Sequence, residues 1–360
     1  MADNQVKLGR WARAEYRRLK ETAEMPPATH TDIHVERDIP VENGARTAIG
    51  HDVAFVSEWL AGTAGDEWWL RHRFAGDAHP GRTVTLLAGW QDLFLTGTFD
   101  DFDALRARGD DVRIIAGDWT HHNVSSAISV GELMRGFDDD ASAPLARIEV
   151  TGTGGGWRDL DVWPPASTPR TWHPAAAGAL AETPTRGEAN YTYDPVDPTP
   201  MAGGRSLNPF VAGRRSQRRR ESRDDVLVFT TEALSEPVEA IGIAQTRADL
   251  TSTNPRVDLF LRLCDVDEKG ASTTIVDVFR RLDAQHGRRT ETLTFPPMAH
   301  RFAAGHRLRL QVSSGAHPLH LRNPGTADPC HDFSHLVASE QTIHLGEGTR
   351  LTLPVTQEVS

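Results

Sequence analysis

Residues 82–123 read RTVTLLAGWQDLFLTGTFDDFDALRARGDDVRIIAGDWTHHN and decide the fold of the first part of the chain. Two β-rich runs, at 82–88 and 112–116, flank a segment at 98–108 in which apolar residues recur at helical spacing. This order predicts a β-α-β unit. Its crossover makes the two strands parallel, so that their carboxyl ends meet at one edge of the sheet.

An acid and a base stand at the two predicted strand ends. Asp92 follows the first run and His121 follows the second, so we expect both side chains at the same sheet edge. A carboxylate that holds an imidazole ready to accept a proton forms two thirds of a serine-hydrolase triad. Two structural alternatives stay open, in which Asp92 caps the following helix and His121 is a polar loop residue.

Composition sets limits on the class of protein. A length of 360 residues suggests two domains of about 150–200 residues each. The formal charge of −11 argues against a nucleic-acid partner held through its phosphates.

The sequence has neither a signal-peptide pattern nor about 18 consecutive apolar residues, so we expect a cytoplasmic protein without membrane contact. Cys264 and Cys330 are too few for a disulfide framework, and we expect both reduced, with Cys264 buried in a strand.

Helices are predicted on both sides of the β-α-β unit. Residues 6–24 have the spacing of an amphipathic helix, and 124–137 predict a further helix. Residues 51–74 read as two helical pieces with a dense group of tryptophans, which either fill a core or line a substrate cleft: Trp59, Trp68 and Trp69.

The chain changes character after residue 143. Prolines and glycines are scattered through 144–223, which predicts long loops with short extended pieces. From 225 onward short strands recur, and the apolar alternation at Val257, Leu259, Leu261 and Leu263 indicates one buried face. We therefore predict an α/β part over 1–143 and an all-β jelly-roll sandwich over 144–360, with 153–223 rich in loops.

Two clusters outside this scheme have competing interpretations. The basic run at 214–223 reads as a solvated loop or as a patch for an anionic ligand. A histidine and cysteine group near the C-terminus reads as ordinary loop residues or as a metal site, although its spacing fits no zinc pattern: His317, His320, Cys330, His331 and His335. No phosphate-loop or dinucleotide motif occurs, and we expect no cofactor.

Several ordered blocks resemble one enzyme family. GWQDLF at 89–94 and GDWTH at 117–121 are similar to the acid and histidine motifs of the cocaine esterase and X-prolyl dipeptidyl-peptidase family of α/β-hydrolases. Later blocks resemble that family's C-terminal jelly-roll domain: GWR at 156–158, YTYDPVDP at 191–198, DDVL at 224–227 and GHRL at 305–308.

The resemblance implies a hydrolase core, a helical cap and a jelly roll that cleave esters or amides through an acyl-serine. It implies that Asp92 is the triad acid and His121 the base, with His122 as the less favoured neighbour. The family motif usually has an aromatic residue where this chain has Gln91 and a proline where it has Asp118. Neither difference removes a group that transfers protons.

A nucleophile is missing from the expected place. The family carries it on a G-x-S-Y-x-G elbow before the acid, whereas the only serine before Asp92 is Ser57, inside a helical pattern without adjacent glycine. We therefore expect no nucleophile in this chain and only two strands of the hydrolase sheet, with an open edge. Such a remnant would need an N-terminal hydrolase half as its partner.

Two functions are consistent with these patterns. The first is a serine hydrolase, incomplete in this chain, that acts on a small-molecule ester or an X-Pro peptide. The tryptophans of 51–74 favour the ester. The second is a non-catalytic jelly-roll module that binds a ligand or supports assembly.

Overall fold

The computed structural model describes residues 83–123, 127–136, 144–326 and 333–356, together with a few single residues between 46 and 67. The chain divides into two compact units, Met1–Arg73 with His331–Ser334 and Phe74–Cys330 with His335–Ser360. The second unit holds nearly all described residues. The helix predicted at 6–24, the tryptophans of 51–74, Ser57 and Cys330 lie outside the described residues.

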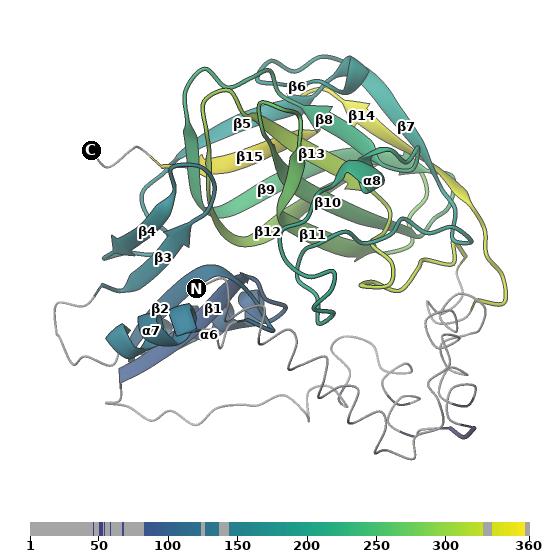
Figure 1. Cartoon of the computed structure of the whole chain (residues 1–360). Coiled ribbons are helices and arrows are strands. Elements are labelled where there is room, and N and C mark those ends of the chain that lie inside the picture. Colours follow the sequence, from purple (N-terminus) through teal and green to yellow (C-terminus); the bar gives the residue numbers. More distant parts are fainter. Residues whose placement is uncertain are drawn as a thin grey trace. The chain divides into compact units, whose positions relative to one another are not determined.

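The first part of the second unit is a four-stranded sheet in the order β1-β2-β3-β4 (Figure 1). Parallel pairing joins β1 to β2 and β2 to β3, and antiparallel pairing joins β3 to β4. This confirms the predicted β-α-β unit. In chain order the elements are β1 (Thr83–Gln91), α6 (Leu95–Ala107), β2 (Asp111–Thr120), α7 (Ala127–Gly136), β3 (Ala146–Val150) and β4 (Gly156–Leu160).

The expectation of a two-stranded remnant is wrong. Two further strands, β3 and β4, come from residues beyond 143 and continue the sheet. The residues of β3, ARIEV, alternate between buried and half-buried positions, as they do in a strand with one face on the core. Helix α7 provides the crossover that makes β3 parallel to β2. The predicted boundary at 143/144 stays a prediction.

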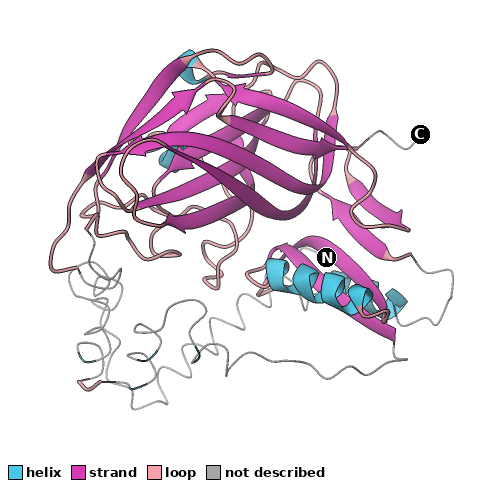
Figure 2. Cartoon of the chain, turned by 180° about the vertical axis from the view of Figure 1, so that it is seen from behind, coloured by secondary structure: helices cyan, strands magenta, loops and turns pink. Residues whose placement is uncertain are grey.

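The rest of the unit is a β-sandwich, as predicted, and strands dominate the view in Figure 2. One sheet has the order β11-β10-β13-β8, and the other has the order β6-β5-β15-β9-β14-β7 with β12 paired to β9. Side chains from both sheets form one hydrophobic core. The strands are β5 (Thr168–Pro174), β6 (Leu180–Ala181), β7 (Gly187–Tyr193), β8 (Leu227–Thr230), β9 (Val238–Ser252), β10 (Val257–Val266), β11 (Ser272–Leu282), β12 (Arg289–Phe302), β13 (Arg307–Ser313), β14 (Ser339–Leu345) and β15 (Arg350–Val355).

Strand β10 is buried on both faces rather than on one. Leu259, Leu261 and Leu263 belong to the core between the sheets, in agreement with the predicted alternation. Arg262 is fully buried, and its guanidinium donates to Gln217 Oε1 at 2.8 Å and to Asp277 Oδ2 at 2.8 Å. A buried guanidinium is tolerated because a carboxylate and further acceptors compensate for its lost hydration.

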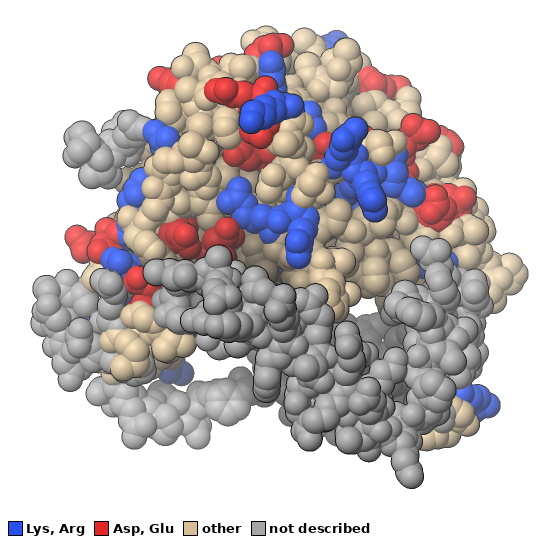
Figure 3. All heavy atoms as spheres, viewed as in Figure 1, with Lys and Arg blue, Asp and Glu red and all other residues tan. Residues whose placement is uncertain are grey.

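The basic run at 214–223 is not simply a solvated loop. It includes the short helix α8 (Arg218–Glu221), in which Arg220 is only 1% exposed. Arg220 donates to the carbonyl of Gly315 at 2.9 Å, and burial followed by the charge of Arg262 lowers its pKa to about 9. Arg218 and Arg219 are exposed, and Figure 3 shows basic side chains gathered around the position of α8. The run therefore covers β10 with one side and faces solvent with the other.

The four-stranded sheet packs against the sandwich. Trp90 and Phe99 form a buried cluster with Trp163, whose ring centroid lies 6.4 Å from that of Trp90 and 5.0 Å from that of Phe99. Thr151, directly after β3, donates its backbone N–H to the carbonyl of Ala299 in β12 at 3.0 Å. These contacts cover apolar surface that the predicted remnant would have left exposed.

Candidate functional site

The pairing of β1 with β2 places Asp92 opposite His121. Gly89 pairs with Gly117, but after a shift in register Gln91 pairs with Thr120, so β2 contains one extra residue at this point. Asp92 directly follows β1, and His121 directly follows β2. A bulge of this kind re-aims the side chains that follow it.

Gly89 permits this bulge. A Cβ atom at this position would lie 2.5 Å from the carbonyl oxygen of Trp119, closer than any side chain tolerates. The glycine thus allows the backbone of β2 to approach β1 where the extra residue is inserted.

Asp92 and His121 face each other as the acid and base of a triad would. Nδ1 of His121 lies 3.4 Å from each carboxylate oxygen of Asp92. Asp92 is 6% exposed, and 36% of the His121 side chain is exposed. Within the described part of the chain, nothing makes a hydrogen bond to Nε2 of His121. Nε2 is the nitrogen that would accept a proton from a nucleophile.

The helix-cap alternative for Asp92 is wrong, because α6 has Phe94 at its N-cap and no side-chain capping hydrogen bond. Oδ1 of Asp92 accepts a hydrogen bond from the backbone N–H of Phe94 at 2.9 Å, in the turn that leads into α6. The same side chain thus stabilises the turn and faces His121. The hydrogen bond from Phe94 fixes the carboxylate, which helps to hold the imidazole in one orientation.

A cavity of about 450 Å³ lies beside the pair. Its lining combines apolar residues of β1 and α6, including Leu87 and Leu95, with Asp92, Asp101 and His121. Phe94 is 58% exposed, and its ring meets that of His121 edge-on at 5.2 Å. No serine or cysteine occurs among the described residues that line this cavity.

Gln91 links the end of β1 to the sandwich through a contact that the sequence did not reveal. Its side chain is buried, and Nε2 donates to the carbonyl of Ile275 at 2.8 Å. Ile275 is the extra residue at a shift in register between β10 and β11, where Leu263 pairs with Val276 and Cys264 pairs with Thr274. The bulge removes this carbonyl from the regular ladder, and Gln91 satisfies it.

A segment of the sandwich part also contacts the end of β2. Arg214 lies 3.8 Å from the carboxylate of Asp118, whose pKa is raised by burial. His122 donates from Nε2 to the carbonyl of Leu207. The ring of His122 is therefore engaged away from Asp92, and of the two neighbouring histidines it is His121 that is paired with Asp92.

The C-terminal histidines do not form a metal site among the residues that the structure describes. His320 stacks on Phe279 with ring centroids 3.9 Å apart, and burial lowers its pKa to about 4. Cys330 and His331 lie outside the described residues.

Within the described chain no helix has the length and apolar character needed to cross a membrane.

Two family models match the chain. The model of the X-Pro dipeptidyl-peptidase C-terminal non-catalytic domain matches residues 140–353, and that of the X-Pro dipeptidyl-peptidase S15 family matches residues 4–123. The second match ends just after His121.

A curated relative supports the same assignment. The chain is 29% identical over 317 residues to the cocaine esterase of Rhodococcus sp. (strain MB1 Bresler), a match over 72% of this chain and 54% of the relative. The chain thus spans about half the length of this relative.

Solved structures share the fold. An alpha-amino acid ester hydrolase matches with a TM-score of 0.76 at 20% identity over 89% of this chain and 64% of its own length. An aminopeptidase from a marine sediment archaeon, Thaumarchaeota archaeon, matches with a TM-score of 0.75 at 19% identity over 91% of this chain and 64% of its own length.

Proposed function

Because the chain belongs to the X-Pro dipeptidyl-peptidase family of serine hydrolases, we propose that it supplies the acid and base of a serine-hydrolase active site. Asp92 orients His121 through Nδ1 and stabilises the imidazolium, and Nε2 accepts the proton of the attacking serine. The observation that carries this proposal is the face-to-face placement of Asp92 and His121, with Nδ1 3.4 Å from the carboxylate.

The nucleophile is proposed to come from outside this sequence. A G-x-S-x-G elbow does not occur anywhere in the 360 residues, and a helical pattern at Ser57 does not produce the sharp turn that exposes a nucleophile. An N-terminal hydrolase half would place its serine over the cavity beside His121 and would complete the catalytic group.

The proposed substrate is a small ester with an apolar acyl group. Leu87, Ala88 and Leu95 line the cavity, and the exposed ring of Phe94 stands against His121. An apolar wall suits an acyl or aryl group. An X-Pro peptide is the other candidate, and it additionally needs an anchor for its free amine. Asp101 is a carboxylate in the same lining that offers one.

A fluorophosphonate probe tests the origin of the nucleophile. The purified chain is expected to remain unlabelled, because a fluorophosphonate reacts with an activated serine. Robust labelling of any serine in this chain would refute the proposal.

Complementation tests the roles of the acid and base. An N-terminal hydrolase half that carries a serine elbow is added in trans, and p-nitrophenyl acetate hydrolysis is measured for each half and for the mixture. Activity in the mixture alone, lost with Asp92→Asn, supports the proposal. Activity that survives this substitution contradicts it.

The second candidate is a non-catalytic module. The observation that favours it is the match of residues 140–353 to a domain described as non-catalytic. Absence of hydrolysis from the chain and from the complemented mixture, with both halves folded and associated, would favour the module over the hydrolase.

A further inference from the structure

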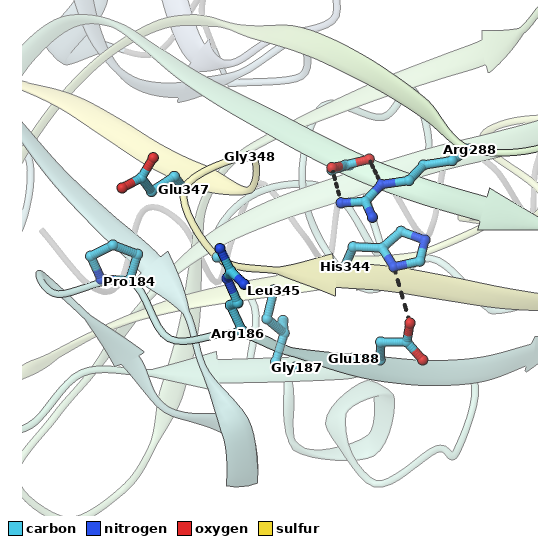
Figure 4. A pocket seen from close by; sticks show the side chains of 11 residues that line it. Pro184, Arg186, Gly187, Glu188, Arg288, His344, Leu345, Glu347 and Gly348 are labelled. Carbon is cyan, nitrogen blue, oxygen red and sulfur yellow. Dashed lines mark hydrogen bonds and ion pairs between the residues drawn. The ribbon is translucent and has the colours of Figure 1, made fainter.

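A second cavity of about 550 Å³ lies at the ends of β7 and β14 (Figure 4). It shares no lining residue with the cavity beside His121. Its volume falls in the range of about 300–1,000 Å³ typical of small-molecule sites. Strand pairing forms its base, since Gly187 pairs with Leu345 and Glu188 with His344.

Two pairs of side chains in the wall are held in place. Arg288 donates to both carboxylate oxygens of Asp249, at 2.8 and 2.5 Å, and this contact lowers the pKa of Asp249. His344 Nε2 lies 2.7 Å from the Thr251 hydroxyl, and its Nδ1 lies 3.3 Å from Glu188 Oε1. In Figure 4, dashed lines mark the contact of Arg288 with the carboxylate of Asp249 and the contact of His344 with Glu188. The polar groups of the wall are therefore oriented before any ligand arrives.

The turn at 346–349, which directly follows β14 and lines the cavity, is also held in place. His173 Nδ1 lies 3.3 Å from the carbonyl of Gly346 and 3.1 Å from that of Thr349. Gly348 packs so closely on Asp249 that a Cβ atom would lie 3.0 Å from its Oδ2. The turn thus presents backbone rather than side chains to part of the cavity.

Charges of both signs remain available in the lining. Arg186 and Glu347 are exposed, and among the described residues neither side chain has an ion-pair partner. In Figure 4 the guanidinium of Arg186 lies between Glu347 and the pair of His344 with Glu188. Glu188 contacts His344 through Oε1, and its second carboxylate oxygen takes no part in that contact.

We propose that this cavity binds a small zwitterion, namely a free amino acid or a dipeptide. Arg186 takes the ligand carboxylate, because a guanidinium presents a planar pair of donors that matches it. Glu188 accepts a hydrogen bond from the ligand ammonium group through the carboxylate oxygen that does not contact His344. Asp249 and Arg288 compensate each other's charge. Of the remaining charges, a simple anion meets the carboxylates of Glu188 and Glu347, and a simple cation meets Arg186, so a ligand with both charges is the best complement.

This inference does not depend on the hydrolase proposal, because none of its residues belongs to the catalytic cavity. The test uses the whole chain and isothermal titration calorimetry with L-alanyl-L-alanine. We expect saturable binding with a Kd below about 1 mM. The N-acetylated dipeptide and the dipeptide amide, which each lack one charge, are expected to bind at least about tenfold more weakly.

Variants locate the site. Arg186→Gln and Glu188→Gln are each expected to weaken binding at least about tenfold. Arg218→Gln and Glu236→Gln change exposed charges away from this cavity, and both variants are expected to bind the dipeptide with unchanged affinity. Because all four positions are exposed, circular dichroism is expected to show the same fold and Tm in each variant.

Three results would overturn the proposal. One is the absence of saturable binding up to about 10 mM dipeptide. Another is equal affinity for the zwitterion and for both blocked derivatives. The third is binding that survives Arg186→Gln and Glu188→Gln together, which would place the dipeptide elsewhere on the chain, including in the cavity beside His121.

Discussion

The side-chain amide of Gln91 donates a hydrogen bond of 2.8 Å to the carbonyl of Ile275, 184 residues further along the chain. It joins the residue before Asp92 to the bulge between β10 and β11. The end of the strand that presents the acid is thus fixed by the sandwich and not by its own sheet alone.

Replacing Gln91 with Ala leaves the buried carbonyl of Ile275 without this donor. We expect the free energy of unfolding to fall by about 1–3 kcal/mol, the cost of an unsatisfied buried acceptor with its hydrogen bond lost. Urea denaturation followed by tryptophan fluorescence measures this value. Thr83→Ala, at the exposed start of β1, serves as the control and changes stability by less than about 0.5 kcal/mol. An equal loss in both variants would contradict a specific role for Gln91.

Replacing His121 with Gln is expected to lower kcat for p-nitrophenyl acetate by a factor on the order of 10³ or more in the complemented enzyme, because proton transfer to the base is lost. His122→Gln is the matched control, since the ring of His122 donates to Leu207 and does not face Asp92. We expect it to retain kcat within about tenfold. A larger loss with His122→Gln than with His121→Gln would reverse the assignment of the base.

Replacing Asp277 with Asn removes the charge that compensates for Arg262. The guanidinium then remains buried without its carboxylate partner, and we expect a loss of about 3–5 kcal/mol in the free energy of unfolding. Guanidinium chloride denaturation gives the comparison. Asp159→Asn, which weakens an exposed contact with Arg147, is expected to cost less than about 1 kcal/mol. Similar losses in the two variants would show that the buried pair contributes nothing beyond a surface pair.

His320 makes stability depend on pH. Its pKa is lowered from 6.5 to about 4, mainly by burial, so below pH 6.5 the unfolded state binds more protons than the folded state. The contribution of His320 is therefore complete above pH 6.5 and is lost as the pH falls toward 4, with a slope of up to about 1.4 kcal/mol per pH unit.

His320→Phe tests this dependence, because phenylalanine keeps a ring to stack on Phe279 but does not titrate. Chemical denaturation between about pH 4.5 and 7 is expected to give a shallower profile for the variant than for the original chain. His286→Gln, a substitution of a histidine at an exposed position, is the control. A variant with an unaltered slope would show that His320 is not the source.

The β-α-β unit and most of the sandwich strands could be predicted because their signals are local. Apolar alternation in β10 and helical spacing in α6 depend on neighbours a few residues away. Strands β5, β6 and β7 lie within the segment that was predicted to be long loops with short extended pieces. Two prolines interrupt β5, and β6 has only two residues, so neither has a sustained strand pattern. The partners of β5 and β7 in the sheet, β15 and β14, lie more than 100 residues later in the chain.

The basic run illustrates a different limit. RRSQRRRESR has the composition of a solvated surface, and Arg218 and Arg219 fit that interpretation. Arg220 and Gln217 are buried because the chain folds back over β10, where Arg262 and other polar groups need partners. No local pattern distinguishes an arginine that will face another strand's polar side chains from one that will face water.

The sequence by itself determined that an aspartate and a histidine follow two parallel strands, and that the rest of the chain is rich in strands, because residue type and period act over short distances. Only the tertiary structure decided which groups meet. The register shift at Gly89 aligned Asp92 with His121, and Ile275 fixed Gln91. The four-stranded sheet gained its cover from β12 and Trp163. These outcomes depend on packing between segments far apart in the chain, and such contacts arise only when the buried polar and apolar groups of the whole unit are satisfied together.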